Sequence, residues 1–490
     1  MKTQKKYILL YWIKKRREKR NTIIKTTIIG ITLMLLALVA AAQDTIKTLS
    51  PQQLAAIIRL YHPVARQADI NIEKAKAGII TAKGGFDPLL TNATAQKTFD
   101  GNNYYYYNRP EITIPTWYGI SINGGLEYLS GNRTDPRDTK GESSFIGITI
   151  PLAKNLLMDK RRAALQTAKI MKEASAVEKR SIINTLMQEA LTMYWNWVKH
   201  YLIYKLASDA IAINEKRIEL IRISFRQGDR PALDTIEALT QLQNFQLWQS
   251  QARLDFQNMG LELSNYLWAA DNTPFFLQPD VIPDEESQML KADSFVTPDL
   301  AQILETIRDQ HPDLLQYQFK LSALDIEKKL KFQEILPTVN FRYNQLGRGY
   351  DIAKTITNPL FENSFQYGIS IGIPLRLSAG RGEYKTAKLK ITETKLQQYQ
   401  KIQQLENKIK SYYNELAALK TQVSLYEKAV QNYNTLLKGE ETRLLNGESS
   451  LFLVNNRESK TLEALQKLTE LKVKYFQANS LLLGTAGMLN

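Results

Sequence analysis

The chain has 490 residues, among them 23 Gly, 16 Pro and no Cys, and its formal net charge is +15. The absence of cysteine excludes disulfides, zinc sites built from cysteine, and a lipid attached to an N-terminal cysteine. So few glycines and prolines in so long a chain predict long, uninterrupted elements.

The N-terminus is predicted to be a secretory signal peptide. Ten basic residues lie within the first 25 positions, an apolar run covers 28–39, and three alanines at 40–42 suit a signal peptidase. This order is typical of a secretory leader, so we expect 1–42 to be removed. An uncleaved membrane anchor is the alternative, because the basic lead is long.

Most of the positive charge belongs to this leader. Removing its ten basic residues and its one acid, Glu18, from totals of 64 and 49 leaves 54 and 48, a net charge of +6. No nucleic-acid partner is therefore expected. After residue 42 no apolar stretch reaches the roughly 18 residues of a spanning helix, so the exported chain is periplasmic, secreted or part of an outer-membrane barrel.

The sequence contains an internal repeat. Tyr118–Ile122 is identical to Tyr367–Ile371 at an offset of 249, and Gly228 matches Gly447 at an offset of 219. The difference of 30 indicates extra sequence in the first half, expected within 123–160. The predicted organisation is a first repeat (43–271), a linker (272–298) and a second repeat (299–490).

Each repeat is predicted to begin with a helix, over about 51–83 and 299–334, that ends just before a proline. His62 and His311 are repeat equivalents, each followed by proline. Their matched positions favour a shared role in a helix turn over metal binding. The third histidine, His200, lies on a predicted coiled-coil helix, so no metal site is expected.

Strands follow the first helix of each repeat. In Ile146–Ile150 and Ile369–Ile373, isoleucine alternates with Gly, Ser or Thr, which predicts one apolar and one polar face. Such a strand suits a barrel with lipid outside and water inside, and the tyrosines at 104–107 favour a membrane interface. An ordinary soluble sheet packed on helices is the alternative.

The expected strands are too few to close a barrel alone. One chain offers about four, or six if 112–131 forms another pair, whereas the smallest closed barrels need about eight. Open sheet edges cannot face lipid, so the chain is expected to oligomerise.

Very long helices come next, over 161–226 and 381–446, each predicted to span roughly 100 Å. Apolar or aromatic residues recur every seven positions from Trp197 to Phe225, from Ile402 to Val430 and from Leu405 to Tyr433, which is coiled-coil spacing. Gly228 and Gly447 are expected to end these helices in tight reversals. The return helices are predicted over 232–268 and 450–484.

This order of elements resembles the TolC-like outer membrane efflux family over nearly all of 50–486. The most specific match is the family's tip pattern of Arg, a bulky residue, two variable residues and Gly. Arg443-Leu444-Leu445-Asn446-Gly447 fits that pattern, and in the segment from Ser224 to Gly228 a serine replaces the Arg.

The resemblance implies a mainly α fold with a membrane β-barrel portion, in which three protomers share a twelve-stranded barrel continued by an α-helical barrel. It implies an outer-membrane location with a long periplasmic extension, and the linker would lie in the equatorial region. The implied function is the passive exit duct of a tripartite efflux or type I secretion system. The implied partners are two further copies of the chain, a periplasmic adaptor (membrane fusion) protein and, indirectly, an inner-membrane pump.

The resemblance also implies functional residues at the hairpin tips. The implied adaptor contacts are Phe225, Gly228, Arg443, Leu444 and Gly447. Asp234 is a candidate entrance gate, because family members place acids after the tip glycine; a solvated helix residue is the equal alternative. Leu453 and Asn456 occupy the corresponding places in the second repeat, so a double acidic ring is not expected.

No catalytic or cofactor site is predicted, and the chain is not expected to be an enzyme. Asp284-Glu285-Glu286 reads as a solvated charge run, and Ser378–Gly382 lacks the Gly-Lys-Ser/Thr of a phosphate-binding loop. The alternative function is a periplasmic coiled-coil scaffold or adaptor without a pore.

Overall fold

The computed structural model describes residues 48–135, 139–284, 287, 290 and 298–489. The predicted signal peptide lies outside them, and the predicted linker is described only in part. In the described segments no helix has both the length and the apolar character needed to cross a membrane. The elements are β1 (Thr48–Leu49), α2 (Pro51–Tyr61), α3 (Pro63–Gly84), β2 (Leu89–Phe99), β3 (Asn102–Pro115), β4 (Ser121–Ser130), β5 (Gly141–Pro151), α4 (Lys160–Arg226), α5 (Ala232–Ser264), β6 (Ile282–Pro283), α7 (Leu300–Gln310), α8 (Pro312–Gln333), β7 (Thr338–Arg348), α9 (Ile352–Thr357), β8 (Phe365–Gly372), α10 (Ser378–Leu445) and α11 (Leu451–Thr485).

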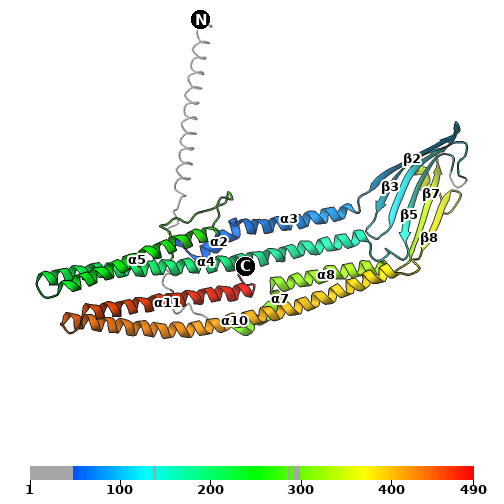
Figure 1. The fold of residues 1–490 in the computed structure, drawn as a ribbon. Coiled ribbons are helices and arrows are strands. Elements are labelled where there is room, and N and C mark those ends of the chain that lie inside the picture. The colour runs from blue at the N-terminus through cyan, green and yellow to red at the C-terminus, as the bar shows by residue number, and fades with distance from the viewer. Residues whose placement is uncertain (1–47, 136–138, 285–286, 288–289, 291–297, 490) are drawn as a thin grey trace, which may run out of the picture.

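The molecule is elongated, with the large sheet at one end and two helical tips at the other (Figure 1). The helix α4 runs the whole way, with α3 beside its sheet-end half and α5 beside its tip half. In the same way α8 and α11 flank α10. We call α4–α5 the first hairpin and α10–α11 the second hairpin.

The predicted first helix of each repeat is two helices, divided at the His-Pro step. A residue before proline disfavours the helical conformation, and His62 and His311 are both extended there, with ψ of 131° and 125°. The Nδ1 atom of His62 accepts from the backbone N–H of Val64, and that of His311 from the N–H of Asp313. The predicted role of these histidines in a helix turn is thus confirmed.

Most heptad positions of α10 are buried, as coiled-coil spacing predicts. Ile409 and Leu416 of α10 are fully buried in a cluster with Tyr475 and Leu482 of α11. A second large cluster, around Trp197 of α4, joins the two repeats near the middle of the molecule. Both hairpins are therefore held along their length by apolar packing.

The large sheet has six antiparallel strands in the order β2-β3-β4-β5-β7-β8. The sequence predicted about four strands, or six if 112–131 formed another pair. The additional pair, β3 and β4, overlaps that segment. The first repeat thus contributes four of the six strands and the second repeat two. β5 pairs with β7, so the sheet joins the two repeats.

Candidate functional site at the hairpin tips

Both hairpins reverse direction through the same backbone turn. Gly228 and Gly447 have φ of +82° and +79°, in the left-handed region that favours glycine. Around Gly228 the N–H of Asp229 donates to the carbonyl of Ser224, and the N–H of Gly228 to that of Phe225. The same pair of bonds surrounds Gly447, so each long helix ends in a Schellman motif.

The two tips expose large apolar side chains. Phe225 is 44% exposed, and Leu445, which the sequence reasoning did not single out, is 86% exposed. Leu444 instead packs beside Leu451 on the cluster that joins the two hairpins. Of these two adjacent leucines, Leu445 is therefore the one exposed at the tip. Leu444 faces the neighbouring hairpin and Leu445 faces away from it. The sequence motif alone does not show which of the two faces the hairpin.

Arg443 lies at the second tip and holds its turn. Its Nη2 atom donates to the carbonyl of Glu448, 3.3 Å away, and its Nη1 atom lies 3.6 Å from Glu440. The guanidinium remains largely exposed. Arg443 thus caps the reversal and leaves its charge available at the end of the molecule.

Asp234 is ion-paired rather than free. Its carboxylate lies 3.1 Å from the guanidinium of Arg230, one turn away, and both side chains are about one-fifth exposed. Arg230 also donates to the carbonyl of Leu444 at 3.3 Å. The candidate gate residue therefore belongs to a link between the first and second tips.

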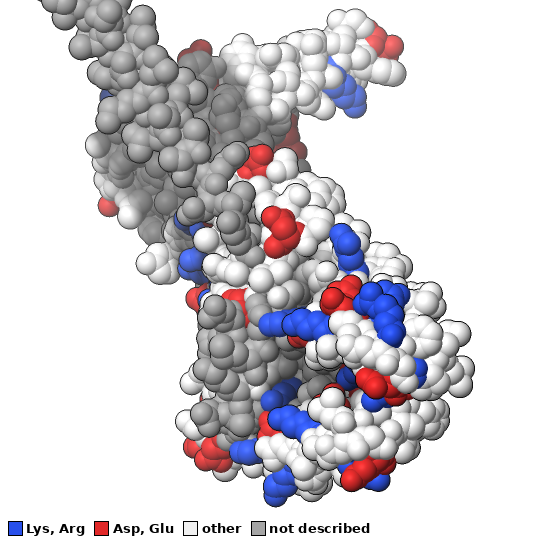
Figure 2. Space-filling model, turned by 90° about the vertical axis from the view of Figure 1, so that its left-hand side faces the viewer, with Lys and Arg blue, Asp and Glu red and all other residues white. Residues whose placement is uncertain are grey.

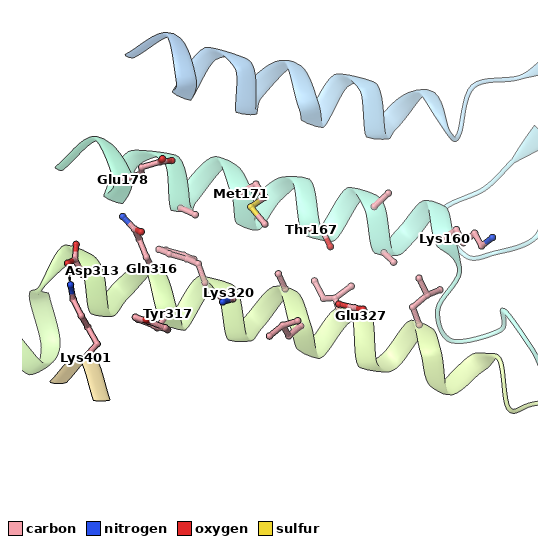
Figure 3. Close-up of a pocket in the computed structure, with 18 residues that line it drawn as sticks. Lys160, Thr167, Met171, Glu178, Asp313, Gln316, Tyr317, Lys320, Glu327 and Lys401 are labelled. Carbon is pink, nitrogen blue, oxygen red and sulfur yellow. Dashed lines mark ion pairs between the residues drawn. The ribbon is translucent and has the colours of Figure 1, made fainter. Parts of the chain in front are cut away.

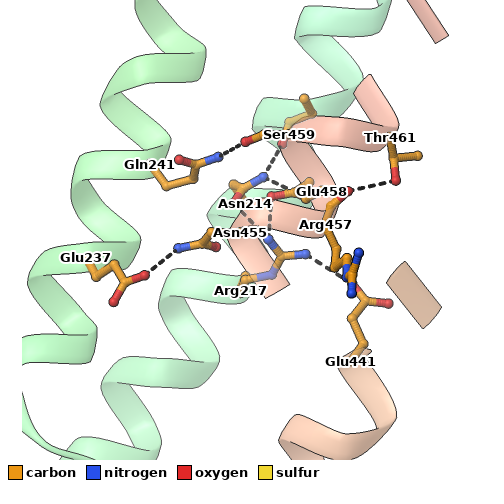
Figure 4. Close-up of polar contacts among 11 residues, drawn as sticks. Asn214, Arg217, Glu237, Gln241, Glu441, Asn455, Arg457, Glu458, Ser459 and Thr461 are labelled. Atoms are coloured by element: carbon orange, nitrogen blue, oxygen red, sulfur yellow. Dashed lines mark hydrogen bonds and ion pairs between the residues drawn. The ribbon is translucent and has the colours of Figure 1, made fainter. Parts of the chain in front are cut away.

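A polar network joins the hairpins further from the tips (Figure 4). The Arg217 guanidinium of α4 donates to Glu458 of α11 at 2.6 Å and to Glu441 of α10 at 3.1 Å. Asn214 donates to Glu458 at 3.1 Å, and Asn455 donates to Glu237 of α5 at 3.2 Å. Sequence reasoning missed this network, because its members are ordinary surface residue types on long helices.

Charges of both signs surround the tips. Figure 2 looks onto this end of the molecule and shows Lys and Arg side chains interspersed with Asp and Glu. The first turn contains Asp229 and Arg230, and the second Arg443 and Glu448. A mixed surface produces no strong field of one sign, so shape and apolar contact would dominate binding here.

A groove of about 1080 Å³ runs between α4 and α8, far from the tips (Figure 3). Asp313 lies at one end, paired with Lys401 of α10 at 2.8 Å and accepting from Ser181 of α4 at 2.7 Å. Small side chains such as Ala163 and Ala174 line the α4 side. None of the predicted tip residues lines this groove, which is a seam between the repeats.

Within the described part of the chain, no group of three or more His, Asp or Glu residues is arranged to hold a metal ion. The His62 and His311 rings are buried at their helix junctions. His200 lies half-buried on α4.

Part of the sequence matches a family model, and the fold as a whole resembles solved structures. The family model for outer membrane efflux proteins matches residues 303–487, from within α7 to just past α11. No protein of curated function matches the sequence.

Solved structures match nearly the whole chain. CusC, described as a transmembrane channel, is 12% identical with a TM-score of 0.62, covering 89% of this chain and 91% of its own. The outer membrane protein VceC from Vibrio cholerae is 14% identical with a TM-score of 0.59, covering 89% and 96%. The CmeC outer membrane channel of Campylobacter jejuni is 14% identical with a TM-score of 0.58, covering 89% and 85%.

These matches are to channels or outer membrane proteins, the class of protein that the sequence resembles. The second repeat carries the outer membrane efflux protein sequence, and the chain as a whole has the fold of TolC-like outer-membrane channels, which confirms the family resemblance.

Proposed function

We propose that this chain is the passive exit duct of a tripartite efflux or type I secretion system. Three copies share one β-barrel in the outer membrane and one helical tunnel in the periplasm. The observation that carries the proposal is an open sheet at one end of long helical rods (Figure 1), with exposed apolar side chains at the tips at the other end.

The open sheet requires partner chains. Along the described strands, β2 and β8 pair with a neighbour on one side only. Isoleucines 122, 148, 369 and 371 are exposed on one face of this sheet. An exposed apolar face suits lipid, and unpaired edges cannot remain open in lipid, so further copies complete the barrel.

The tips provide the docking end for a periplasmic adaptor. Phe225, Leu445 and Arg443 are exposed there, beside two turns held by identical hydrogen bonds. A rigid turn loses little conformational entropy on binding, so exposed apolar anchors on it can contribute most of the affinity. The adaptor in turn connects the duct to an inner-membrane pump.

Two experiments test the proposal. Purified protein in planar bilayers is expected to conduct as a trimer, and absence of both membrane association and conductance would favour the pore-free scaffold. In cells, a photo-crosslinker at Leu445 is expected to capture a periplasmic coiled-coil adaptor, whereas one at Leu425, exposed on α10 twenty residues before Leu445, is not. Equal capture at the two positions would contradict docking at the tips.

A further inference from the structure

We propose that each chain contributes six strands to the shared barrel, so that three copies close an eighteen-stranded wall through β2–β8 pairing between neighbours. This inference rests on the trimer of the proposed function. The family resemblance implied four strands per chain, and the additional pair is the β3–β4 hairpin.

β3 and β4 lie within the wall and carry its apolar band. In register across the sheet, Ile114 of β3 pairs with Ile122 of β4, and Ile122 pairs with Ile148 of β5. All three are exposed on the same face. If the hairpin were folded into the lumen as a plug, its isoleucines would not be expected to lie in register with Ile148 of β5.

The opposite face of the same hairpin is polar. Arg109 and Glu111 of β3 form an ion pair of 3.4 Å, and the Arg109 guanidinium lies 4.4 Å above the ring of Phe145 on β5. Asn123 of β4 donates to Thr149 of β5 at 3.2 Å. Because successive residues of a strand point to opposite faces, lipid-facing isoleucines place these groups in the lumen.

The direction of the strands allows neighbouring copies to pair. All five pairings in the sheet are antiparallel, so with six strands β2 and β8 run in opposite directions. The β8 strand of one copy therefore meets the β2 strand of the next in an antiparallel pair, as in barrels with an even number of strands. The two strands are the edges of the sheet, and their side chains are exposed.

The test uses disulfides between chains. Because the natural chain contains no cysteine, only the introduced cysteines can form them. Each test variant is the full-length protein in outer membranes. It carries Ser370→Cys in β8 together with Thr91→Cys, Ala93→Cys or Ala95→Cys in β2. These three β2 positions share one face and cover the unknown stagger between copies. The comparison set combines Ser370→Cys with Ser121→Cys or Asn123→Cys in β4.

A disulfide needs Cα atoms about 4.4–6.8 Å apart, which only adjacent strands provide. The expected result is a covalent trimer on oxidation for at least one β2–β8 pair and none for the β4–β8 pairs. Covalent trimers from β4–β8 pairs would place β2 and β3 outside the wall and overturn the proposal. So would an intact trimer without any β2–β8 product.

Failure of the trimer itself is distinguishable, because sedimentation would then show monomers and neither set would cross-link. Electron cryomicroscopy of the unmodified trimer in lipid nanodiscs is a second measurement that needs no substitution. It is expected to show eighteen strands, and a count of twelve would contradict the inference.

Discussion

The Arg217 guanidinium donates to the Glu458 carboxylate at 2.6 Å, from α4 of the first hairpin to α11 of the second. The two side chains are 13% and 5% exposed. Glu458 also accepts from Asn214, so both of its oxygens are bonded across the hairpins. This link holds the tip halves of the two repeats at a set distance.

Replacing Glu458 with alanine is expected to loosen the second hairpin. The substitution leaves a largely buried guanidinium with only Glu441 as its carboxylate partner. We expect the free energy of local opening in α11 to fall by about 3 kcal/mol, measured by hydrogen exchange around residue 458. The matched control is Arg457→Ala, which removes a 44% exposed side chain 4.0 Å from its nearest carboxylate. A similar loss of protection in both variants would contradict the role of the link.

Asp234 and Arg230 are expected to affect ion selectivity in opposite directions. They form a pair of 3.1 Å at the first tip, so the pair is close to neutral. Removing the acid in Asp234→Ala leaves an unpaired cation, and cation preference in bilayer recordings should fall. Removing the cation in Arg230→Ala leaves the acid unpaired, and the cation preference should rise. Shifts of the same sign, or none, would remove Asp234 from the candidate entrance.

The tip glycine Gly447 is expected to be replaceable only at a cost in backbone strain. A methyl group there meets open space, but φ is +79°, so Gly447→Ala should destabilise the tip by about 1 kcal/mol. The control is Gly439→Ala, also in open space but inside α10, which should stabilise it by up to about 1 kcal/mol. Thermal melting of the trimer measures both. Equal effects would mean that the left-handed turn is not maintained.

His311 is expected to make stability depend on pH. Burial lowers its pKa below 6.5, and its Nδ1 atom accepts from the N–H of Asp313. The neutral ring therefore carries its proton on Nε2, which lies 3.1 Å from the carbonyl of Thr485 and donates to it. Protonation at Nδ1 would break the first of these bonds.

The lowered pKa of His311 makes the folded protein less stable as the pH falls. The unfolded chain takes up the proton first as pH falls below 6.5, so stability is full above that pH and declines below it. Asp313, whose pKa is lowered chiefly by the hydrogen bond from Lys401 against the opposing effect of burial, titrates below 3.8 and does not contribute here. The variant His311→Asn keeps a capping acceptor without titrating, so its melting temperature should fall less between pH 7 and pH 5.5. An unchanged pH profile would contradict this assignment.

Local periodicity was enough to predict the helices, the strand faces and the turns. The seven-residue spacing through Ile409 and Leu416 placed both residues on one helix face, and both are fully buried. Gly228 and Gly447 were identified as reversals because only a left-handed backbone ends such long helices so abruptly. The repeat itself indicated that the same elements occur twice.

The tertiary structure alone decided which elements became partners. Nothing local to β5 specifies that it pairs with β7, nearly two hundred residues later, or that β3 and β4 enter the same sheet. The Arg217–Glu458 link likewise spans 241 residues. Side-chain periodicity tells which face of an element is buried, whereas pairing depends on the free energy of the whole assembly of helices and strands. That is why the long helical hairpins and their turns could be predicted from the sequence, whereas the order of the six strands and the contacts between the hairpins could not.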